Sequence, residues 1–430
     1  MQKRREKPIL IGLEAATLTA TSTEQNIAVS LLTGGGDRPY VFGLATELMS
    51  KGVALDIIGS DELDSPEFHG NPSVNFLNLR GDQSSGAGFL KKLRRVLSYY
   101  AKLIGYAAAA KPKIFHILWN NKFEAFDRTL LMLYYRLLGK KIVLTVHNVN
   151  AGKRDGKDTW LNRLTLRSQY RLADHIFVHT EDMKRELGGE FGIDGTRVTV
   201  IPFGVNNDAP NTSLTPAEAK QHLGIRASEK VILFFGNITP YKGLEYLVDA
   251  FQQISGQGAE YRLIIAGRAT RYQEYWTEIR ERIEKDVQQG RVLVKANFIP
   301  DEETELYFKA AAVLVLPYRH IYQSGVLFLG YGFGLPALAA DVGSLKDDIV
   351  EGKTGFLFKS EDPIDLAKTI LRYFESELFA NLGTHRQDIR DYVTRQHSWD
   401  IAGRATVDVY SSLQEEQGIS EVHKSTAFLN

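Results

Sequence analysis

Short apolar runs alternate along the chain with longer segments of helical periodicity, and this alternation repeats through most of the 430 residues. Continuous runs of four to eight apolar residues are typical of strands buried on both faces of a parallel sheet. In the first half they predict strands at 26–32, 53–59, 114–118, 141–146, 173–179 and 198–202. In the second half they predict strands at 230–236, 261–267, 292–298, 313–316 and 337–340. The pattern therefore indicates an α/β protein built from repeated βα units.

A polar segment that contains a proline, 206–215, interrupts this repeat and is typical of a linker. It divides the chain into a first domain at 1–205, with a mobile leader expected at 1–25, and a second domain at 206–396. The last segment, 397–430, carries an apolar helical stripe and then a tail without periodicity, which we expect to be a helix followed by a loose end. Two similar halves joined by a linker predict a cleft between them.

The segment from Val313 to Ala340 has the features of a βαβ unit with a candidate anion site. A strand ends at Pro317, a polar loop follows, and Ser324 is a good N-cap for the next helix. Gly334-Leu335-Pro336 then ends that helix. The first turn of a helix presents free backbone N–H groups that can bind an anion. An ordinary βαβ unit without a ligand is the alternative interpretation.

Three other loops follow predicted strands, at the sheet edge where open α/β proteins bind ligands. Gly34-Gly35-Gly36 follows the first strand, His147-Asn148 follows the strand at 141–146, and Lys242 follows the strand that ends at Gly236. Glycines either let the backbone approach a ligand or form a tight turn, and a single histidine is often structural. Asp37-Arg38-Pro39 breaks the spacing of a GxGxxG dinucleotide motif.

A basic amphipathic helix is expected at 89–110. Its leucines recur at helical spacing, and the other positions are crowded by the basic residues Lys91, Lys92, Arg94, Arg95 and Lys102. Such a helix can lie on an anionic membrane surface, so we consider peripheral membrane contact. The alternative is the solvated face of a packed helix.

Composition narrows the classes of function. The chain has 52 Lys and Arg against 52 Asp and Glu, so no overall field favours nucleic acid. It contains 0 cysteines, which excludes disulfides and thiolate metal sites and is compatible with a reducing cytoplasm. No apolar run is long enough to cross a bilayer, and Glu14 interrupts the one apolar patch near the start that suggests a signal peptide. We therefore expect a cytoplasmic location, with contact at the inner face of the membrane as an extension of it.

Several motifs in the second half resemble the group 1 (family four) retaining glycosyltransferases, and they keep the order and approximate spacing of that family. They are Phe235-Gly236-Asn237-Ile238-Thr239-Pro240-Tyr241-Lys242-Gly243-Leu244-Glu245, Pro317-Tyr318, Gln323-Ser324-Gly325-Val326, Phe333-Gly334-Leu335-Pro336, Asp341-Val342-Gly343 and Gly352-Lys353-Thr354-Gly355. The first half is similar more loosely, through its glycine turn, Thr145-Val146-His147 and Ala173-Asp174.

The resemblance implies the GT-B fold, in which two Rossmann-like doubly wound domains face a cleft, with the acceptor mostly on the first and the nucleotide sugar mostly on the second. It implies retaining transfer of a sugar, of the hexosyltransferase type, from a nucleoside-diphosphate sugar to an acceptor hydroxyl. No metal is expected, because the cleft motifs contain no Asp-x-Asp pair. The attack would be front-face, with the leaving diphosphate taking the acceptor's proton. The nucleotide sugar is a substrate, so no cofactor is expected. The acceptor would be a sugar or a lipid-linked molecule in polysaccharide or glycolipid synthesis.

The same resemblance assigns roles to individual residues. His147 would position the transferred sugar, and Lys242 would stabilise charge on the departing phosphate. The other residues implied in donor binding are Gly35, Gly36, Gly236, Arg268, Phe298, Ile299, Gln323, Ser324, Gly325 and Val326. Asn120 and Asn148 would contact the acceptor.

Two departures from the family pattern leave an alternative open. The paired glutamates that the family often carries are replaced by Ile321 and Leu329, and the phosphate-binding arginine after the strand-ending glycine is absent, with Arg268 as its candidate substitute. The alternative is a GT-B protein that binds a nucleotide sugar without transferring it. A nicotinamide-dependent oxidoreductase is disfavoured because neither half has the GxGxxG turn.

Overall fold

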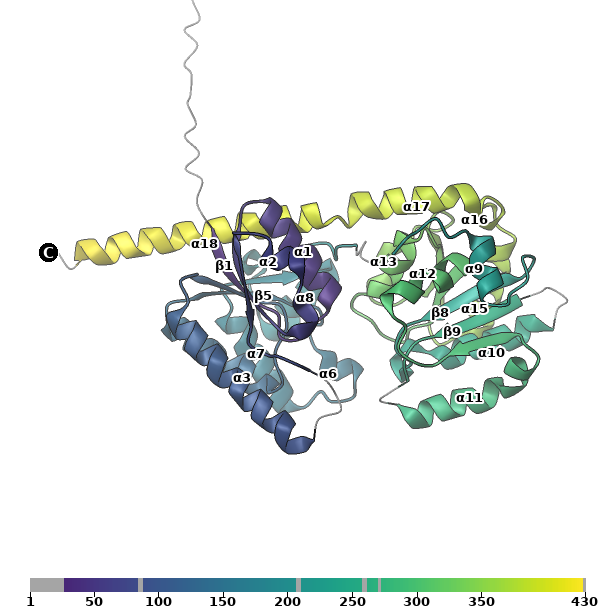
Figure 1. The fold of residues 1–430 in the computed structure, drawn as a ribbon, viewed down its shortest axis with the longest axis horizontal. Coiled ribbons are helices and arrows are strands. Elements are labelled where there is room, and N and C mark those ends of the chain that lie inside the picture. The colour runs from purple at the N-terminus through teal and green to yellow at the C-terminus, as the bar shows by residue number, and fades with distance from the viewer. Residues whose placement is uncertain (1–26, 84–87, 206–209, 257–260, 270–271, 428–430) are drawn as a thin grey trace, which may run out of the picture.

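The computed structural model describes residues 27–427 with gaps at 84–87, 206–209, 257–260 and 270–271. The leader predicted at 1–25 and part of the predicted linker therefore lie outside the described residues. The described chain forms two α/β domains side by side, each with a parallel sheet at its centre (Figure 1).

The first domain contains a seven-stranded sheet in the order β3-β2-β1-β4-β5-β6-β7, with all pairs parallel. Its strands are β1 (Ala28–Leu32), β2 (Ala54–Gly59), β3 (Val74–Asn78), β4 (Ile114–Ile117), β5 (Lys141–Thr145), β6 (His175–Val178) and β7 (Val198–Val200). Its helical segments are α1 (Arg38–Ser50), η1 (Asp61–Leu63), α2 (Pro66–His69), α3 (Phe89–Ala109), α4 (Glu124–Phe126), η2 (Asp127–Leu131), α5 (Met132–Leu137), α6 (Ala151–Arg154), α7 (Trp160–Leu172), α8 (Glu181–Phe191) and η3 (Gly195–Arg197).

The second domain contains a six-stranded parallel sheet in the order β10-β9-β8-β11-β12-β13. Its strands are β8 (Lys230–Phe235), β9 (Tyr261–Ala266), β10 (Val292–Lys295), β11 (Val313–Leu316), β12 (Ala337–Ala340) and β13 (Gly355–Phe358). Its helical segments are α9 (Pro216–His222), η4 (Pro240–Lys242), α10 (Leu244–Ser255), α11 (Gln273–Gln288), α12 (Asp301–Ala310), α13 (Gly325–Gly332), α14 (Leu345–Asp348), α15 (Pro363–Phe374), α16 (Glu377–Ala380) and α17 (Leu382–Gln396).

Helices cover both faces of each sheet, so each domain has two apolar layers. In the first domain α3, α5, α7 and α8 bury residues in one layer, and α1 buries residues in the other. In the second domain α10, α11 and α15 pack on one face, while α12, α13 and α17 pack on the opposite face. Strands with apolar residues on both sides explain why the continuous apolar runs located nearly every central strand.

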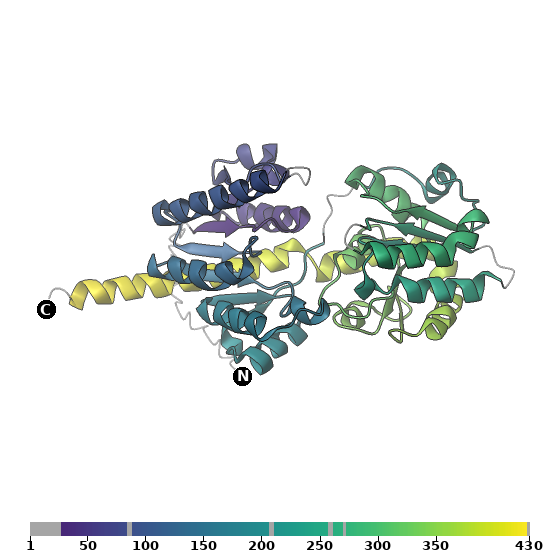
Figure 2. The same ribbon diagram turned by 90° about the horizontal axis from the view of Figure 1, so that it is seen from below.

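The last helix, α18 (Trp399–Ala427), runs along the upper edge of the first domain in Figure 1. It follows α17 on the second domain and runs back along the first, where it packs against α1 and β4 (Figures 1 and 2). Ala402, Tyr410 and Leu413 are buried in the first domain's core. Within that core, Tyr410 Oη lies 2.5 Å from Nδ1 of His116. The segment that we expected to be a loose end continues as helix through Ala427.

Two strands, β3 and β13, lie at the edges of their sheets and did not appear in the sequence pattern. β3 alternates exposed with half-buried residues and has no continuous apolar run. β13 begins at Gly355 and is only four residues long. The criterion of buried runs therefore misses β3, whereas the edge strands β7 and β10 do have short apolar runs and were predicted.

Candidate functional site

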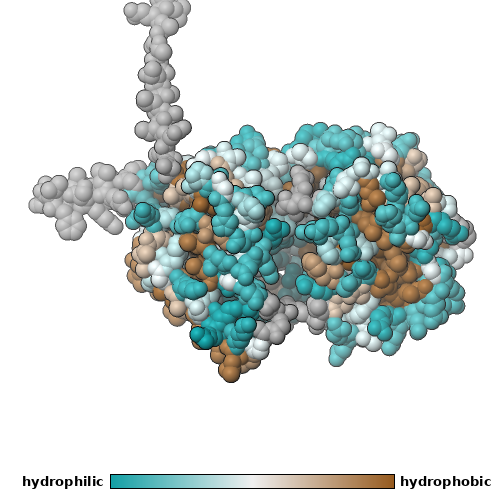
Figure 3. Space-filling model, in the orientation of Figure 1, coloured by the Kyte–Doolittle hydropathy of each residue, from teal (hydrophilic) through white to brown (hydrophobic). Residues whose placement is uncertain are grey.

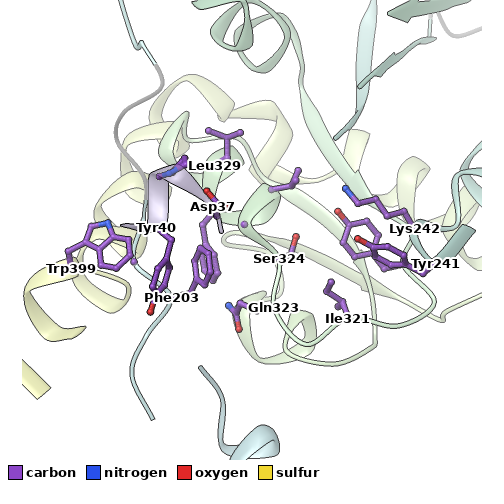
Figure 4. A pocket seen from close by; sticks show the side chains of 16 residues that line it. Asp37, Tyr40, Phe203, Tyr241, Lys242, Ile321, Gln323, Ser324, Leu329 and Trp399 are labelled. Atoms are coloured by element: carbon purple, nitrogen blue, oxygen red, sulfur yellow. The ribbon is translucent and has the colours of Figure 1, made fainter. Parts of the chain in front are cut away.

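A pocket of about 340 Å³ lies between the two domains and receives residues from both (Figure 4). The first domain contributes Asp37, Pro39, Tyr40, Phe203 and Gly204, and α18 contributes Trp399. The second domain contributes Tyr241, Lys242, Tyr318, Ile321, Gln323, Ser324, Gly325, Val326, Phe328 and Leu329. The loops after β8 and β11 therefore open into one space, as expected of the carboxyl edge of a parallel sheet. We refer to this space as the interdomain pocket.

Lys242 is a buried cation in the interdomain pocket, with 6% of its surface exposed. It ends the short turn η4 after β8, and its Nζ lies 5.4 Å from the centre of the Tyr318 ring. Gly236 has φ +101°, and a Cβ at that position would lie 2.7 Å from Nζ, so glycine leaves room for the ammonium. Burial, with a smaller contribution from the positive Arg154, lowers the pKa of Lys242 to about 8. Among the described residues no carboxylate pairs with this ammonium.

Arg154 approaches Lys242 from the other domain, and the sequence motifs did not indicate it. It is the last residue of α6, and its Cζ lies 4.6 Å from the centre of the Tyr241 ring. Its Nε donates to Asp155 Oδ1 at 2.7 Å, which fixes the orientation of the guanidinium. Two cations from different domains thus lie close to one another, an arrangement that favours an anionic ligand between the domains.

The start of α13 forms the opposite side of the pocket. Ser324 caps the helix as predicted, because its Oγ accepts a hydrogen bond from Leu327 N at 3.3 Å. Gly325 is exposed to the pocket, and the nearest atom to a Cβ at this position would be Phe203 Cε1 at 3.8 Å. The packing therefore does not require glycine here. Its N–H and that of Val326 belong to the first helical turn, whose donors have no acceptor within the helix.

Gln323 precedes this turn with one side-chain atom that lacks a partner. Its Nε2 donates weakly to Asp348 Oδ2 at 3.5 Å. Its Oε1 is buried and has no hydrogen-bond partner among the described residues. Burial of a polar atom without a partner is unfavourable, and in a pocket it points to a ligand that supplies the partner.

His147 lies in a separate, smaller pocket of about 130 Å³ in the first domain, with Asn120 and Asn148. The imidazole stacks on Trp119 with 4.1 Å between ring centres, and its Nδ1 lies 3.0 Å from Nε2 of His179. Burial, reinforced by neighbouring histidines, lowers the pKa of His147 well below its usual value, so the ring is neutral. Its Nε2 is buried without a partner among the described residues.

Tyr40 connects the two pockets. It lines the interdomain pocket, and its ring meets the edge of the His147 ring with 4.7 Å between centres. The side chain of Asn120 is engaged, because its Oδ1 accepts a hydrogen bond from Gln169 Nε2 at 2.8 Å. Asn148 is half-buried. The structure thus groups the three first-domain candidates together, next to the interdomain pocket and outside its lining.

The glycine turn after β1 is explained by close packing within the first domain. A Cβ on Gly36 would overlap the Trp119 ring, and one on Gly35, where φ is +77°, would lie 2.6 Å from the guanidinium of Arg80. Neither glycine lines the interdomain pocket, although the next residue, Asp37, does. Donor contact by Gly35 and Gly36 stays a prediction. The Trp119 ring is sufficient to require glycine at 36, and the positive φ favours glycine at 35.

The other predicted donor residues lie beyond the lining of the interdomain pocket. Arg268 is exposed, with its Cζ 5.9 Å from the centre of the Phe298 ring. Phe298 is itself 63% exposed, whereas Ile299 is buried in the second domain's core. Within the described ranges no three His, Cys, Asp or Glu side chains converge to hold a metal ion. The absence of a metal from the reaction stays a prediction.

The two sheets and the interdomain pocket with its buried Lys242 define the class of protein. The order and parallel direction of the strands, with a pocket between two such domains, correspond to the GT-B fold. Among solved structures, the chain is similar to sucrose-phosphate synthase from Thermosynechococcus elongatus, with a TM-score of 0.70 and 20% identity over 91% of this chain and 100% of that one. It is also similar to Anabaena Alr3699/HepE in complex with UDP and glucose, with a TM-score of 0.69 and 16% identity over 90% and 100% of the two chains.

Sequence comparison identifies the family. Residues 34–209 match the Glycosyltransferase Family 4 model, and residues 229–376 match the Glycosyl transferases group 1 model. A D-inositol 3-phosphate glycosyltransferase of Acidothermus cellulolyticus is 28% identical over 406 residues, covering 89% of this chain and 87% of the relative. The uncharacterized glycosyltransferase MJ1607 of Methanocaldococcus jannaschii is 24% identical over 89% and 96%. The chain therefore belongs to the group 1, family four glycosyltransferases.

Proposed function

We propose that this glycosyltransferase moves a sugar from a nucleoside-diphosphate sugar to an acceptor hydroxyl, with retention of anomeric configuration and without a metal ion. The observation that carries the proposal is the buried ammonium of Lys242, which faces the first turn of α13 across the interdomain pocket without an acidic partner among the described residues. A diphosphate carries negative charges that need such donors.

Arg154 gives this diphosphate a second cation in place of the arginine missing from the motif. It is close enough to Lys242 to lower that residue's pKa, and it packs over Tyr241, which lines the pocket beside Lys242. Both cations and the α13 N–H groups would stabilise charge on the departing phosphate, which is where negative charge grows during transfer. The similar Anabaena protein has been crystallised with UDP and with UDP-glucose, which supports a nucleotide-sugar donor.

The proposed mechanism uses groups of the interdomain pocket, of the smaller pocket beside it and of the loop after β10. No glutamate stands at the positions of Ile321 and Leu329, so a carboxylate nucleophile from the family's usual pair is missing. Front-face attack needs none, because the acceptor hydroxyl itself bonds to the anomeric carbon as the bond to the diphosphate breaks, and the leaving diphosphate accepts the hydroxyl's proton. His147 would donate or accept a hydrogen bond to the transferred sugar through its unpartnered Nε2. Phe298 and Ile299 would border the base, and Asn120 and Asn148 the acceptor.

A binding screen followed by a transfer assay tests this function. Nucleoside diphosphates and their sugars should raise the melting temperature, since a ligand at one hundred times its dissociation constant adds about 2.7 kcal/mol. The best donor is then incubated with candidate sugar and lipid-linked acceptors, and the anomeric configuration of the product is read by NMR. Product with inverted configuration would contradict retention. Donor binding with no turnover of the nucleotide sugar, even by hydrolysis, would favour a protein that binds without transfer.

We also propose that the first domain contacts a membrane and that the acceptor is used in polysaccharide or glycolipid synthesis there. No described helix is long and apolar enough to span a bilayer. Instead, α3, α5 and α7, which pack on the same face of the sheet, expose large apolar side chains outward. They are Phe89, Leu90, Leu93, Leu97 and Ile104 on α3, Leu133 and Leu137 on α5, and Trp160, Leu161 and Leu164 on α7.

Charge supports an anionic membrane as the partner of this three-helix surface. The exposed side of α3 also carries Lys91, Lys92, Arg94 and Lys102. Apolar residues gather where α3 begins, at the lower tip of the first domain (Figure 3). Basic residues near an anionic surface contribute about 1 kcal/mol each, and buried apolar side chains add to this.

Vesicle co-sedimentation tests the three-helix surface. Leu97→Gln with Trp160→Gln should reduce binding to phosphatidylglycerol vesicles by about tenfold or more, because two large apolar contacts are lost. The matched control, Ile364→Gln, changes a side chain that is 57% exposed on the other domain and should have no effect. Equal sedimentation of all variants would show that the apolar residues do not contact the membrane.

A further inference from the structure

A second polar pocket, of about 280 Å³, lies in the first domain and is lined by cations. Its charged residues are Arg80, Lys92, Arg95 and Lys122, and Tyr99 and Asn121 complete its polar side. We refer to it as the basic pocket. Arg95 donates to the carbonyl of Asp82 and lies 3.8 Å from its carboxylate, so its charge is partly compensated. Arg80, Lys92 and Lys122 therefore make the electrostatic potential of the basic pocket positive.

Arg80 is held in place for binding. Its Cζ lies 5.1 Å from the centre of the Tyr99 ring, a cation–π contact that holds the guanidinium beside this ring. The Tyr99 hydroxyl donates to Asn121 Oδ1 at 2.6 Å, and the Asn121 backbone N donates to Asp127 Oδ2 at 2.7 Å, so the support is itself anchored. Arg80 Nη1 is buried and has no hydrogen-bond acceptor among the described residues. A buried charged donor without an acceptor is costly unless a ligand supplies one.

The basic pocket lies on the same sheet edge as the proposed reaction site. Arg80 follows β3, and Asn121 and Lys122 follow β4, so these residues leave the carboxyl ends of parallel strands. The guanidinium of Arg80 also packs against Gly35, two residues before Asp37, which lines the interdomain pocket. One turn of backbone therefore separates the basic pocket from the interdomain pocket. A molecule with an acidic group in the basic pocket would extend toward the transferred sugar.

We propose that the basic pocket binds a phosphate group of the acceptor, and thus that the acceptor is a phosphorylated molecule. This inference rests on the proposed function, and it names the class of acceptor. The guanidinium of Arg80 supplies paired N–H donors that match phosphate oxygens, and Lys92 and Lys122 supply mobile charges at the rim. The phosphate can belong to a soluble sugar phosphate or to a lipid head group, because the start of α3 borders both the basic pocket and the three-helix surface.

Calorimetry with a soluble probe tests the basic pocket directly. Glucose 6-phosphate is titrated into the protein saturated with a nucleoside diphosphate, with glucose as the uncharged comparison. Arg80→Gln should weaken phosphate binding by about tenfold or more, and Lys122→Gln by a smaller factor. Lys111→Gln removes the same charge from an exposed site of this domain that does not line the pocket, and it should leave binding unchanged.

A vesicle arm distinguishes the source of the phosphate. If the soluble probe binds and depends on Arg80, the pocket takes a free phosphate. If only phosphatidic acid vesicles show this dependence, measured against phosphatidylcholine vesicles, it takes a lipid head group, which equally supports the proposal. Phosphate and vesicle binding that are unchanged in both Arg80→Gln and Lys122→Gln would overturn it. The affinity of the wild type and of the same variants for a nucleoside diphosphate is measured in parallel. If the variants keep this affinity, a negative result for phosphate binding overturns only the proposed acceptor site. If the wild type does not bind a nucleoside diphosphate, the proposed function itself is contradicted.

Discussion

Replacing Lys242 by methionine should weaken donor binding while it stabilises the fold. Methionine keeps most of the length and apolar volume of the side chain and removes the ammonium. The ammonium lowers the stability of the ligand-free protein, because it is buried beside Tyr318 and near a second cation. Loss of affinity together with gain of stability is the pattern of a group retained for function and not for folding.

Both magnitudes follow from the pocket. The pKa of Lys242 falls from 10.5 to about 8, which corresponds to at most about 3 kcal/mol of destabilisation at pH 7, where the folded state must hold the proton. Because the unfolded chain binds more protons between pH 8 and 10.5, the wild type should gain stability as pH rises through that window. The variant lacks this gain. A charge-assisted bond to phosphate is worth about 1.5–3 kcal/mol, so donor affinity should fall roughly 10–150-fold.

Calorimetry of nucleoside-diphosphate binding between pH 7 and 9, with thermal melts of the same samples, measures both effects. Wild-type affinity should fall toward pH 9 as Lys242 loses its proton, whereas the affinity of Lys242→Met should not follow that fall. Lys359→Met is the matched control, because Lys359 has a side chain that is 79% exposed in the same domain. A Lys242→Met protein that binds the donor as tightly as wild type and melts at the same temperature would refute the reasoning.

Three further predictions concern single side chains. His147→Phe should keep the stack on Trp119 but lower transfer by about 10²-fold, measured as initial rate alongside the melting temperature, and full activity would exclude His147 from the reaction. Gly325→Ala should leave the fold intact, because a Cβ there meets nothing closer than 3.8 Å, but it should weaken donor binding measured by calorimetry. The control, Gly105→Ala on α3, should leave donor affinity unchanged. Burial raises the pKa of Asp348 to about 7, so the folded state binds more protons than the unfolded state between pH 4 and 7. As pH rises through that range, the wild type should lose at most about 4 kcal/mol of stability relative to Asp348→Asn in denaturant titrations. Parallel stability profiles of the two proteins would contradict this.

The parts of the site that could be predicted from the sequence are those that a single loop defines. Ser324 and Gly325 stand at the start of a helix, and the preceding strand, the N-cap and the glycine and proline that end the helix are all visible in the local sequence. Lys242 lies within seven residues of Gly236, where the preceding predicted strand ends. Parallel topology then brings both loops to one edge without further information. The same reasoning located the central strands, because burial on two faces leaves a continuous apolar run.

The residues that could not be predicted are those that tertiary packing brings in from elsewhere. Tyr40, Phe203 and Trp399 come from α1, from the end of the first domain and from α18, and no motif marks them as lining one pocket. Arg80 is similarly hidden, because only the fold places it beneath the glycine turn. The turn itself was visible in the sequence, but its glycines have a packing reason that the sequence could not distinguish from a ligand-binding one.

Arg154 shows how position in the sequence can mislead about a charge. Arg268 follows a strand-ending glycine, so the sequence indicated it as the substitute for the missing phosphate-binding arginine. In the structure Arg268 is exposed beside Phe298. Arg154, which belongs to the other domain, is instead the arginine close to Lys242. Two cations from different domains repel, and a diphosphate between them would relieve the repulsion, so donor binding should favour the arrangement in which the domains face each other. Arg154→Gln should therefore raise the pKa of Lys242, move the pH-dependent loss of donor affinity to higher pH, and weaken binding at pH 7. An unchanged pH profile with unchanged affinity would show that the diphosphate is held by the second domain alone.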